Sequence, residues 1–437
     1  MMIKQHFLAV ALAIALPAAA SAQTVRRLDI DAMFGLMEQN NRSLRVRQSG
    51  VEAATEGVKA ARSQRLPDIN AQLSASYVGN ALLMDRHFSE AHGLHSPHFG
   101  NQFVVDVRQT IYAGGAIHAG TRLAELDLEK ALAATDLTRQ QQRFLALGQY
   151  LDLKKTANSE QVIRSNIELT EQLIANIEER QRQGVALKND ITRYQLQLQT
   201  LRLNLTKLRN QRAILNHQLC NTLGLATTDS IEPTEDVTAQ AYGRDGEQHW
   251  QDAAALTSPS LRLAAVGEQA AQQQERLAKS SLLPKVALVA QNNLNGPVTF
   301  ELPPINKNLN IWYVGVGVQY SLSSLFKSNK RLHQARIETR QAQEQKTLAQ
   351  EQVNNQVQAA WVNYQQSYVE LETQQKSVEL ARQNYNVINE RYLNQLALVT
   401  DMIDASNMRL DAELAEADAR INIAYAYYKV RYMAGEL

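Results

Sequence analysis

The sequence predicts a mainly helical fold with a small β portion, in which long coiled-coil helices are combined with four β-strands in each chain. Long helices are predicted because residues 98–232 and 305–437 contain no proline and are rich in Ala, Gln, Leu, Glu and Arg, a composition that suits uninterrupted helices. Strands are predicted because short segments alternate apolar and polar residues. A third observation is that this order of segments occurs twice along the chain.

Residues 1–22 are predicted to be a secretory signal peptide. Lys4 gives a positive start, Phe7 to Leu16 form an apolar run, and residues 20–22 (Ala-Ser-Ala) offer a cleavage site before Gln23. The apolar run is too short for a transmembrane helix, which needs about 20 residues. No later segment is apolar enough to span a membrane as a helix, so any membrane insertion must use strands.

The mature chain is predicted to be a tandem duplication forming one intertwined domain. Three segments of the first half recur in the same order in the second: residues 43–45 at 260–262, 66–67 at 283–284, and 179–180 at 390–391. The first structural repeat is residues 23–235 and the second is residues 236–437, with a joint around residues 233–246. Each repeat is expected to run helix, β-hairpin, very long helix, tight turn, helix.

In the first repeat, a helix is predicted from about Asp29 to Leu66, where Pro67 ends it. The next strand has apolar residues at odd positions from Ile69 to Tyr77 and polar residues between them. After a polar loop, a second strand alternates in the same way, with Phe103, Val105, Val107 and Ile111 on its apolar face.

In the second repeat, a strand from about Lys285 to Asn292 is placed by its match to the strand after Pro67. The following strand carries Trp312, Val314, Val316, Val318 and Tyr320 on one face. Trp312 and Tyr320 are separated by about 26 Å along a strand, close to the ~25 Å apolar band between aromatic girdles in outer-membrane barrels. Both are predicted to be girdle residues in contact with outer-membrane lipid. A half-buried soluble sheet is the alternative for any single strand.

The helix after these strands is predicted to be unusually long. Residues 329–394 contain neither Pro nor Gly, and a heptad seam runs through Tyr364, Leu371, Val378, Tyr385 and Tyr392. A helix of this length reaches about 100 Å, which suggests the wall of a tube. Four strands cannot close a barrel, since the smallest outer-membrane barrels have eight. Two, three or four copies of the chain would supply 8, 12 or 16 strands.

The signal peptide, the duplication, the two hairpins and the Arg-x3-Gly-Val-Ala-x3-Asp turn at residues 180–190 together resemble the TolC family of outer-membrane efflux proteins. The resemblance implies a homotrimer with a 12-stranded barrel in the cell outer membrane and an α-barrel tunnel in the periplasm. It implies a passive, tip-gated exit duct for multidrug efflux or type I secretion. The implied partners are a periplasmic adaptor (membrane fusion) protein and an inner-membrane pump of the RND or ABC type.

The same resemblance implies that two helix breaks, residues 184–190 and 395–401, are tips at the periplasmic entrance. The implied adaptor-docking residues are Gly184, Val185, Ala186 and Leu187 in the first tip and Leu396, Ala397 and Leu398 in the second. The second tip has Gln395 where a glycine is expected. We therefore expect another residue of that turn to carry a positive φ angle.

Two acidic residues of the second tip are candidates for the pore entrance. Asp401 and Asp404 are three residues apart, which places both on one helix face, and they match the family's entrance aspartates. In a trimer, each would form a ring of carboxylates that favours cations. The alternative for Asp401 is a charge at a helix N-terminus, facing the helix dipole.

The resemblance also implies an entrance latch made of a tyrosine, an aspartate and an arginine. Tyr392 and Asp190 match the first two, but Ala397 stands where the arginine is expected. The latch is therefore incomplete, or another residue such as Arg391 completes it.

Other function classes find little support. Lys and Arg total 45 and Asp and Glu total 44, without the positive excess of a nucleic-acid-binding protein. Cys220 is the only cysteine, so there is neither an internal disulfide nor a CxxC site. Residues 115–121 resemble a P-loop but lack its lysine, and there is no recognisable nucleophile turn. We predict no enzyme activity and no cofactor.

Four histidines cluster between the first two strands: His87, His92, His95 and His98. Imidazole binds transition metals, but Gly93 and Pro97 interrupt any regular spacing, and we expect a solvated outer loop without a metal. The alternative function is a periplasmic coiled-coil scaffold or adaptor without a pore, which would not need lipid-facing strands.

Overall fold

The computed structural model describes residues 24–237, 242–243, 245–301 and 303–437, so the predicted signal peptide lies outside the described residues. The fold is mainly helical, with 67% helix and 16% strand, and the predicted fold class is confirmed. The described residues form two compact units, the first made of residues 24–41, the described part of 142–242 and Gln365–Ala426, and the second of the remainder. The boundaries of the two sequence repeats remain a prediction.

The helices and strands follow one another in this order: β1 (Val25–Leu28), α1 (Ile30–Asn40), α2 (Arg42–Ser63), β2 (Asp68–Tyr77), β3 (Ala81–Met84), β4 (Ala91–Leu94), β5 (Phe99–Tyr112), α3 (Ala116–Arg182), α4 (Lys188–Leu223), β6 (Ser230–Pro233), α5 (Glu247–Thr257), α6 (Pro259–Ser280), β7 (Lys285–Gly296), β8 (Leu309–Gln319), α7 (Ser324–Leu393) and α8 (Val399–Ala434). Among the described residues, none of these helices is both long and apolar enough to cross a membrane.

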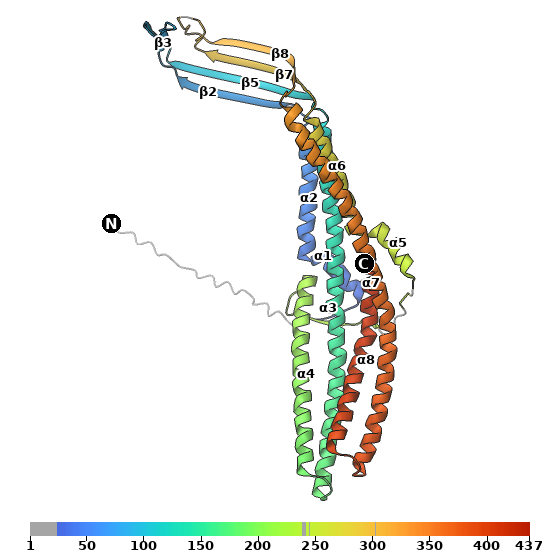
Figure 1. Cartoon of the computed structure of the whole chain (residues 1–437). Helices are drawn as coiled ribbons and strands as arrows, with labels where there is room; N and C mark the ends of the chain where they lie inside the picture. Colours follow the sequence, from blue (N-terminus) through green and yellow to red (C-terminus); the bar gives the residue numbers. More distant parts are fainter. Residues whose placement is uncertain (1–23, 238–241, 244, 302) are drawn as a thin grey trace, which may run out of the picture. The chain divides into compact units, whose positions relative to one another are not determined.

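The first unit is a helical bundle with a small parallel sheet of β1 and β6. Parts of α3, α4, α7 and α8 run side by side within it (Figure 1). A cluster of buried side chains holds these helices together: Ile177, Tyr194, Tyr385, Val399, Met402 and Ala405. The predicted heptad seam is buried at Val378 and Tyr385, which explains how α7 continues without interruption along this bundle.

The prediction of a single helix from Asp29 to Leu66 is wrong, because two helices, α1 and α2, meet at Asn41. The predicted start is right, since the Asp29 side chain accepts a hydrogen bond from the amide of Ala32 at 2.7 Å. Asn41 is extended and buried, and its side-chain amide donates to Gln142 and to the carbonyl oxygen of Thr222. Together with the backbone hydrogen bond from Asn41 to Met37, these tertiary hydrogen bonds pair the side-chain and backbone amides of this buried residue.

The second unit contains an antiparallel four-stranded sheet in the order β2-β5-β7-β8. The four predicted strands are all present, although β7 continues to Gly296 and β8 ends one residue before Tyr320. The loop predicted between the first two strands contains a short hairpin of β3 and β4. Sequence alternation did not reveal this hairpin, because strands of four residues give too few repeats of the pattern.

The strand register gathers the apolar residues on one face of the sheet. One row across the four strands consists of Ile69, Val107, Ala290 and Val314. Ile69 is 66% exposed and Val314 is 63% exposed, so this face is uncovered in the single chain. Among the described strands, β2 and β8 each pair on one side only. The sheet therefore presents an apolar face and two open edges.

Candidate functional site

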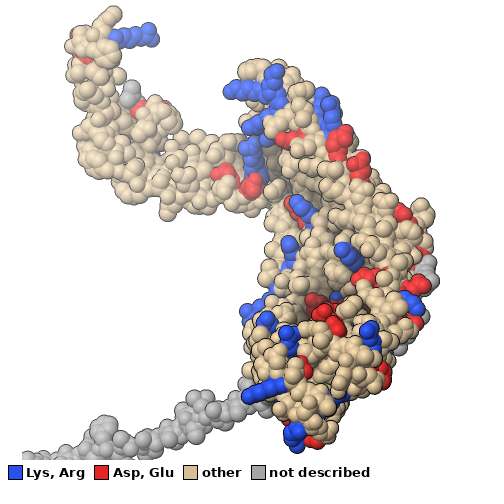
Figure 2. Space-filling model, turned by 60° about the horizontal axis from the view of Figure 1, so that its bottom comes forward, with Lys and Arg blue, Asp and Glu red and all other residues tan. Residues whose placement is uncertain are grey.

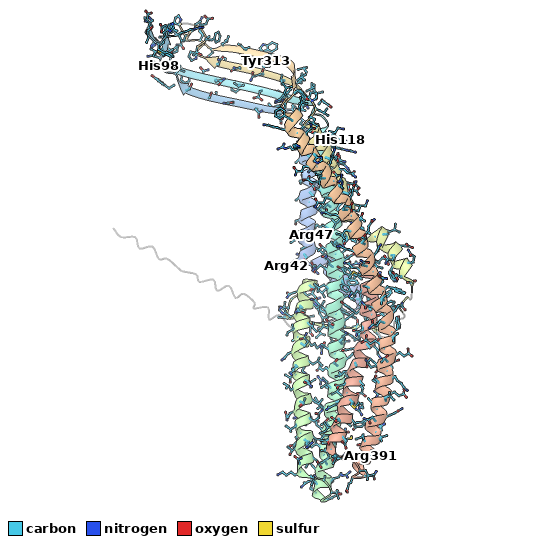
Figure 3. All side chains as sticks on the ribbon, viewed as in Figure 1. Arg42, Arg47, His98, His118, Tyr313 and Arg391 are labelled. Atoms are coloured by element: carbon cyan, nitrogen blue, oxygen red, sulfur yellow. The ribbon has the colours of Figure 1, made fainter. Side chains whose placement is uncertain are left out.

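The two helical turns at the end of the first unit hold the residues predicted to form the entrance. One turn joins α3 to α4, and the other joins α7 to α8. Figure 3 labels Arg391 at this end of the helices. Each turn is built from hydrogen bonds between its own backbone groups, with one carboxylate assisting.

The first turn ends α3 in a Schellman motif. Gly184 has a φ angle of 78°, and its amide donates to the carbonyl oxygen of Gln181 at 3.0 Å. The amide of Val185 donates to the carbonyl oxygen of Arg180, also at 3.0 Å. Asp190 lies in the first turn of α4 and caps that helix, because its carboxylate accepts the backbone amide of Leu187 at 3.3 Å. The turn thus satisfies groups that both helix ends would leave unpaired.

The second turn repeats this geometry without a glycine. Gln395 has a φ angle of 63°, its amide donates to Tyr392, and the amide of Leu396 donates to Arg391 at 2.7 Å. The expectation that another residue would carry the positive φ angle is therefore wrong, since Gln395 carries it. The closing hydrogen bonds require that conformation at the second residue after the helix, at a steric cost of about 1 to 2 kcal/mol for a non-glycine residue.

Apolar side chains project from both turns. Leu187 is 70% exposed, and Leu396 and Leu398 are 68% and 69% exposed. Val185 is also exposed. Ala186 is half-buried and packs on the core cluster of the bundle, and Ala397 is half-buried as well. Both turns therefore combine a fixed backbone with an uncovered apolar surface.

Tyr392 lies near an arginine and an aspartate, the two residue types predicted to join it in the latch. The guanidinium of Arg180 lies 5.8 Å from the centre of the Tyr392 ring, and it donates to the carbonyl oxygen of Leu393 at 3.1 Å. Burial raises the pKa of Tyr392, the charge of Asp190 raises it further, and Arg180 opposes both effects. Arg180 thus lies beside Tyr392, while completion of the latch by Arg391 stays a prediction.

Sequence reasoning missed Tyr194, which lies on α4 in the buried cluster behind the turns. Its hydroxyl is buried and has no hydrogen-bond partner within the described part of the chain. Burial raises the pKa of Tyr194, and the charges of Tyr392, Tyr385 and Asp190 act in the same direction. The available signal was the helical spacing of Tyr194, Leu198 and Leu201, all of which are buried.

Asp401 and Asp404 are both exposed, whereas Met402 and Ala405 between and beside them are buried. The carboxylate of Asp401 accepts the amide of Leu398 at 2.9 Å, so Asp401 caps α8 as its alternative interpretation requires. No hydrogen bond or ion pair involves Asp404 among the described residues. The structure therefore gives Asp401 a local role and leaves Asp404 free to face solvent or a pore.

The predicted histidine cluster lies at the end of the sheet that is remote from α7, where Figure 3 labels His98. The ring of His98 stacks on Tyr77 at 5.0 Å, contacts His95 at 5.3 Å, and has Nδ1 at 2.9 Å from the carbonyl oxygen of Val78. In the described residues, no group of three or more His, Cys, Asp or Glu side chains is suitable for a metal ion.

The predicted girdle residues are uncovered. Trp312 is 71% exposed within β8, and Tyr320 is 41% exposed just beyond its end. Trp312 lies next to Asn292 of β7 in the strand register. Both aromatic side chains are thus available to an external partner.

Comparison with known proteins assigns the chain to a family. The family model "Outer membrane efflux protein" matches residues 34–225 and 250–436, and the chain belongs to the outer membrane efflux protein family. Proteins of this family are passive outer-membrane channels with a helical tunnel in the periplasm. The family, the localisation and the absence of enzyme activity predicted from the sequence are confirmed. In general, channels of this family work as trimers with adaptor proteins and inner-membrane pumps.

Several solved structures share the fold at low sequence identity. The outer-membrane channel OprN is 17% identical, with a TM-score of 0.78, and the match covers 93% of this chain and 90% of OprN. VceC from Vibrio cholerae is 15% identical, with a TM-score of 0.76 and coverage of 93% and 96%. CmeC from Campylobacter jejuni is 12% identical, with a TM-score of 0.77 and coverage of 93% and 85%. No curated protein sequence matched the chain.

Proposed function

We propose that this protein is the trimeric exit duct of a tripartite efflux or type I secretion system, acting as a passive conduit gated at its periplasmic tip. The observation that carries the proposal is the four-stranded sheet with an exposed apolar face and two open edges. In hydrocarbon, every backbone amide and carbonyl must be paired within the protein. A sheet of this kind is stable in a membrane only when its edges are closed.

Three copies of the chain close the sheet into a barrel of twelve strands. β2 of one copy pairs with β8 of the next, so that no edge remains. The apolar face contacts outer-membrane lipid, and Trp312 and Tyr320 belong to the aromatic girdles. The helices continue as a tunnel with the same symmetry.

The helical turns dock onto a periplasmic adaptor (membrane fusion) protein, which links the duct to an inner-membrane pump of the RND or ABC type. The exposed apolar side chains of the two turns support this assignment, since uncovered apolar surface commonly marks protein contacts. The docking residues are Gly184, Val185, Ala186 and Leu187 in one turn and Leu396, Ala397 and Leu398 in the other.

The same end of the helices forms the gate. Asp401 and Asp404 line the constriction as threefold rings, and Asp190 and Tyr392 belong to the latch that holds the closed state. The position of Arg180 beside Tyr392 supports a latch completed from α3. Breaking the hydrogen bond from Arg180 to Leu393 releases α7 from α3.

Cell fractionation and native mass spectrometry in mild detergent test the proposal. The expected result is a trimer recovered with the outer membrane, together with loss of compound export in a deletion strain and its restoration by the plasmid-borne gene. A soluble periplasmic monomer would instead support the scaffold without a pore and would overturn the proposal.

A further inference from the structure

A polar cavity of about 460 Å³ lies in the second unit, where β7 and β8 meet the helices. Its lining includes three cationic side chains, those of Lys285, Lys327 and Arg331, together with the side chains of five serines. None of the residues that line it is acidic. Figure 2 shows Lys and Arg side chains gathered where the sheet joins the helices of this unit.

The three cations have no carboxylate partner among the residues that the structure describes. Most ion pairs of this chain join a cation to a carboxylate on the same or a neighbouring helix, but none in the described residues involves Lys285, Lys327 or Arg331. Like charges around one cavity repel each other. A bound anion of two or more negative charges would relieve that repulsion and would gain hydrogen bonds from charged donors.

A buried hydroxyl in the cavity wall is a second, independent observation that favours ligand binding. Ser324 is 6% exposed, and its Oγ has no hydrogen-bond partner among the described residues. Leaving such a group unpaired is unfavourable. The first amides of α7 are already engaged, since Ser324 donates to Ser321 and Lys327 donates to Ser323. The cavity therefore offers side-chain donors, with the positive end of the α7 dipole adding to their charge.

The strand register shows which side of the sheet the cavity occupies. Lys285 lies opposite Gln319 in the pairing of β7 with β8, and Gln319 accepts a hydrogen bond from Arg108. These residues belong to the face opposite Val286 and Val318, which is the polar face. A ligand on this face approaches from water rather than from the apolar side of the sheet.

We propose that this cavity binds a tetrahedral oxyanion, a phosphate group carried by a water-soluble molecule. Lys285, Lys327 and Arg331 supply the charge, and Ser324 donates a hydrogen bond to one oxygen. If the polar face lines the channel, the cavity is a binding step for anionic cargo on its way out. That last consequence rests on the proposed function, whereas oxyanion binding itself does not.

Isothermal titration of the full-length protein in a neutral detergent with inorganic pyrophosphate tests the proposal. The expected result is saturable binding, weakened more than tenfold in the Lys285→Gln/Lys327→Gln/Arg331→Gln variant. Ser324→Ala keeps the charge and should weaken binding several-fold. A matched control, Lys307→Gln/Lys330→Gln/Arg340→Gln, removes the same charge outside the cavity lining and should bind as the unmodified protein does.

The proposal would be overturned if the cavity and control variants lost pyrophosphate affinity equally, or if the unmodified protein did not bind pyrophosphate. Binding of phosphatidylglycerol vesicles through Lys327, without binding of pyrophosphate, would overturn the soluble ligand in favour of a lipid headgroup. A trimer in the outer membrane that fails to bind pyrophosphate would contradict this inference alone. A soluble monomer that binds pyrophosphate would contradict the proposed function alone.

Discussion

Gln395 occupies a backbone conformation that glycine adopts without steric cost. Gln395→Gly should relieve about 1 to 2 kcal/mol of strain and lose about 0.5 to 1 kcal/mol through the greater freedom of the unfolded chain. We expect a net stabilisation of about 0.5 to 1 kcal/mol, measured by denaturant unfolding. Gly184→Ala is the matched change in the other turn and should destabilise, although an added methyl group would meet no atom within 4 Å. Destabilisation by Gln395→Gly would show that the glutamine side chain makes a contact of its own.

Tyr194 and Tyr150 are both fully buried but differ in their hydrogen bonds. The Tyr150 hydroxyl donates to Leu28 at 2.8 Å and accepts from the amide of Glu235 at 3.1 Å, whereas the Tyr194 hydroxyl is unpaired in the described structure. Tyr150→Phe should therefore destabilise by about 1 to 2 kcal/mol, and Tyr194→Phe should be neutral or stabilising by about 1 kcal/mol. Thermal unfolding of the two variants compares them, and an equal loss in both would indicate a partner for Tyr194.

At the scale of elements, Glu160 of α3 ties its own helix to α4. Its carboxylate is largely buried and accepts from Arg164, Arg209 and Arg212. Burial alone raises the pKa of Glu160, but hydrogen bonds from Arg164 and Arg209 hold that pKa below its ordinary value. A depressed pKa in the folded state means that the stabilisation is complete above the unfolded pKa, about 4.5. This stabilisation is lost as the pH falls from about 4.5 through the lower pKa that Glu160 has in the folded state.

Glu160→Gln should destabilise the bundle by about 1 to 3 kcal/mol at neutral pH, because three guanidinium groups lose their shared negative charge and one of its two accepting oxygens becomes an NH2 donor. Urea unfolding between pH 3 and 7 measures this effect. The difference between variant and unmodified protein should shrink toward the acid end of the range. Glu171→Gln is a control. Glu171 pairs with Arg202 in an exposed position, so loss of this ion pair should change the free energy of unfolding little. A difference that stays constant with pH would show that the charge of Glu160 is unimportant.

The two faces of the sheet give an element-scale prediction for membrane insertion. Val105→Arg or Val316→Arg should each destabilise insertion by about 2 to 4 kcal/mol at mid-membrane, as measured by the yield of heat-modifiable trimer in outer-membrane fractions. Gln291→Arg places the same side chain on the opposite face, beside Tyr313, and should insert normally. Equal defects in all three variants would refute the assignment of the faces.

These elements also show what the sequence can predict. Strict alternation identified β2 and β5, and the absence of proline identified α3 and α7, because both signals are local and long. The break at Asn41 depends on hydrogen bonds that its side chain donates to residues 101 and 181 positions away. The positions of Arg180 and Tyr194 beside Tyr392 depend likewise on which helices become neighbours. Contacts between residues on different helices are decided by tertiary packing, and the local sequence pattern does not predict them.

At the scale of the whole molecule, the charges are almost balanced, with a formal net charge of +1. Any ion preference of an assembled channel must therefore come from where charges are concentrated rather than from their sum. The aspartates of the second turn and the cationic cavity beside the sheet are two such concentrations of opposite sign. Each can be altered without changing the other, because they belong to different units.

The last prediction concerns the aspartates. In a trimer, Asp401 and Asp404 would supply six carboxylates to one narrow opening, and like charges so confined attract multivalent cations. Asp401→Asn/Asp404→Asn removes these charges while keeping an oxygen that accepts the amide of Leu398, so trimer yield should not change. Single-channel recordings should show a lower cation preference and weaker block by trivalent cations. Unchanged selectivity would place both side chains outside the pore and leave Asp401 as the cap of α8 alone.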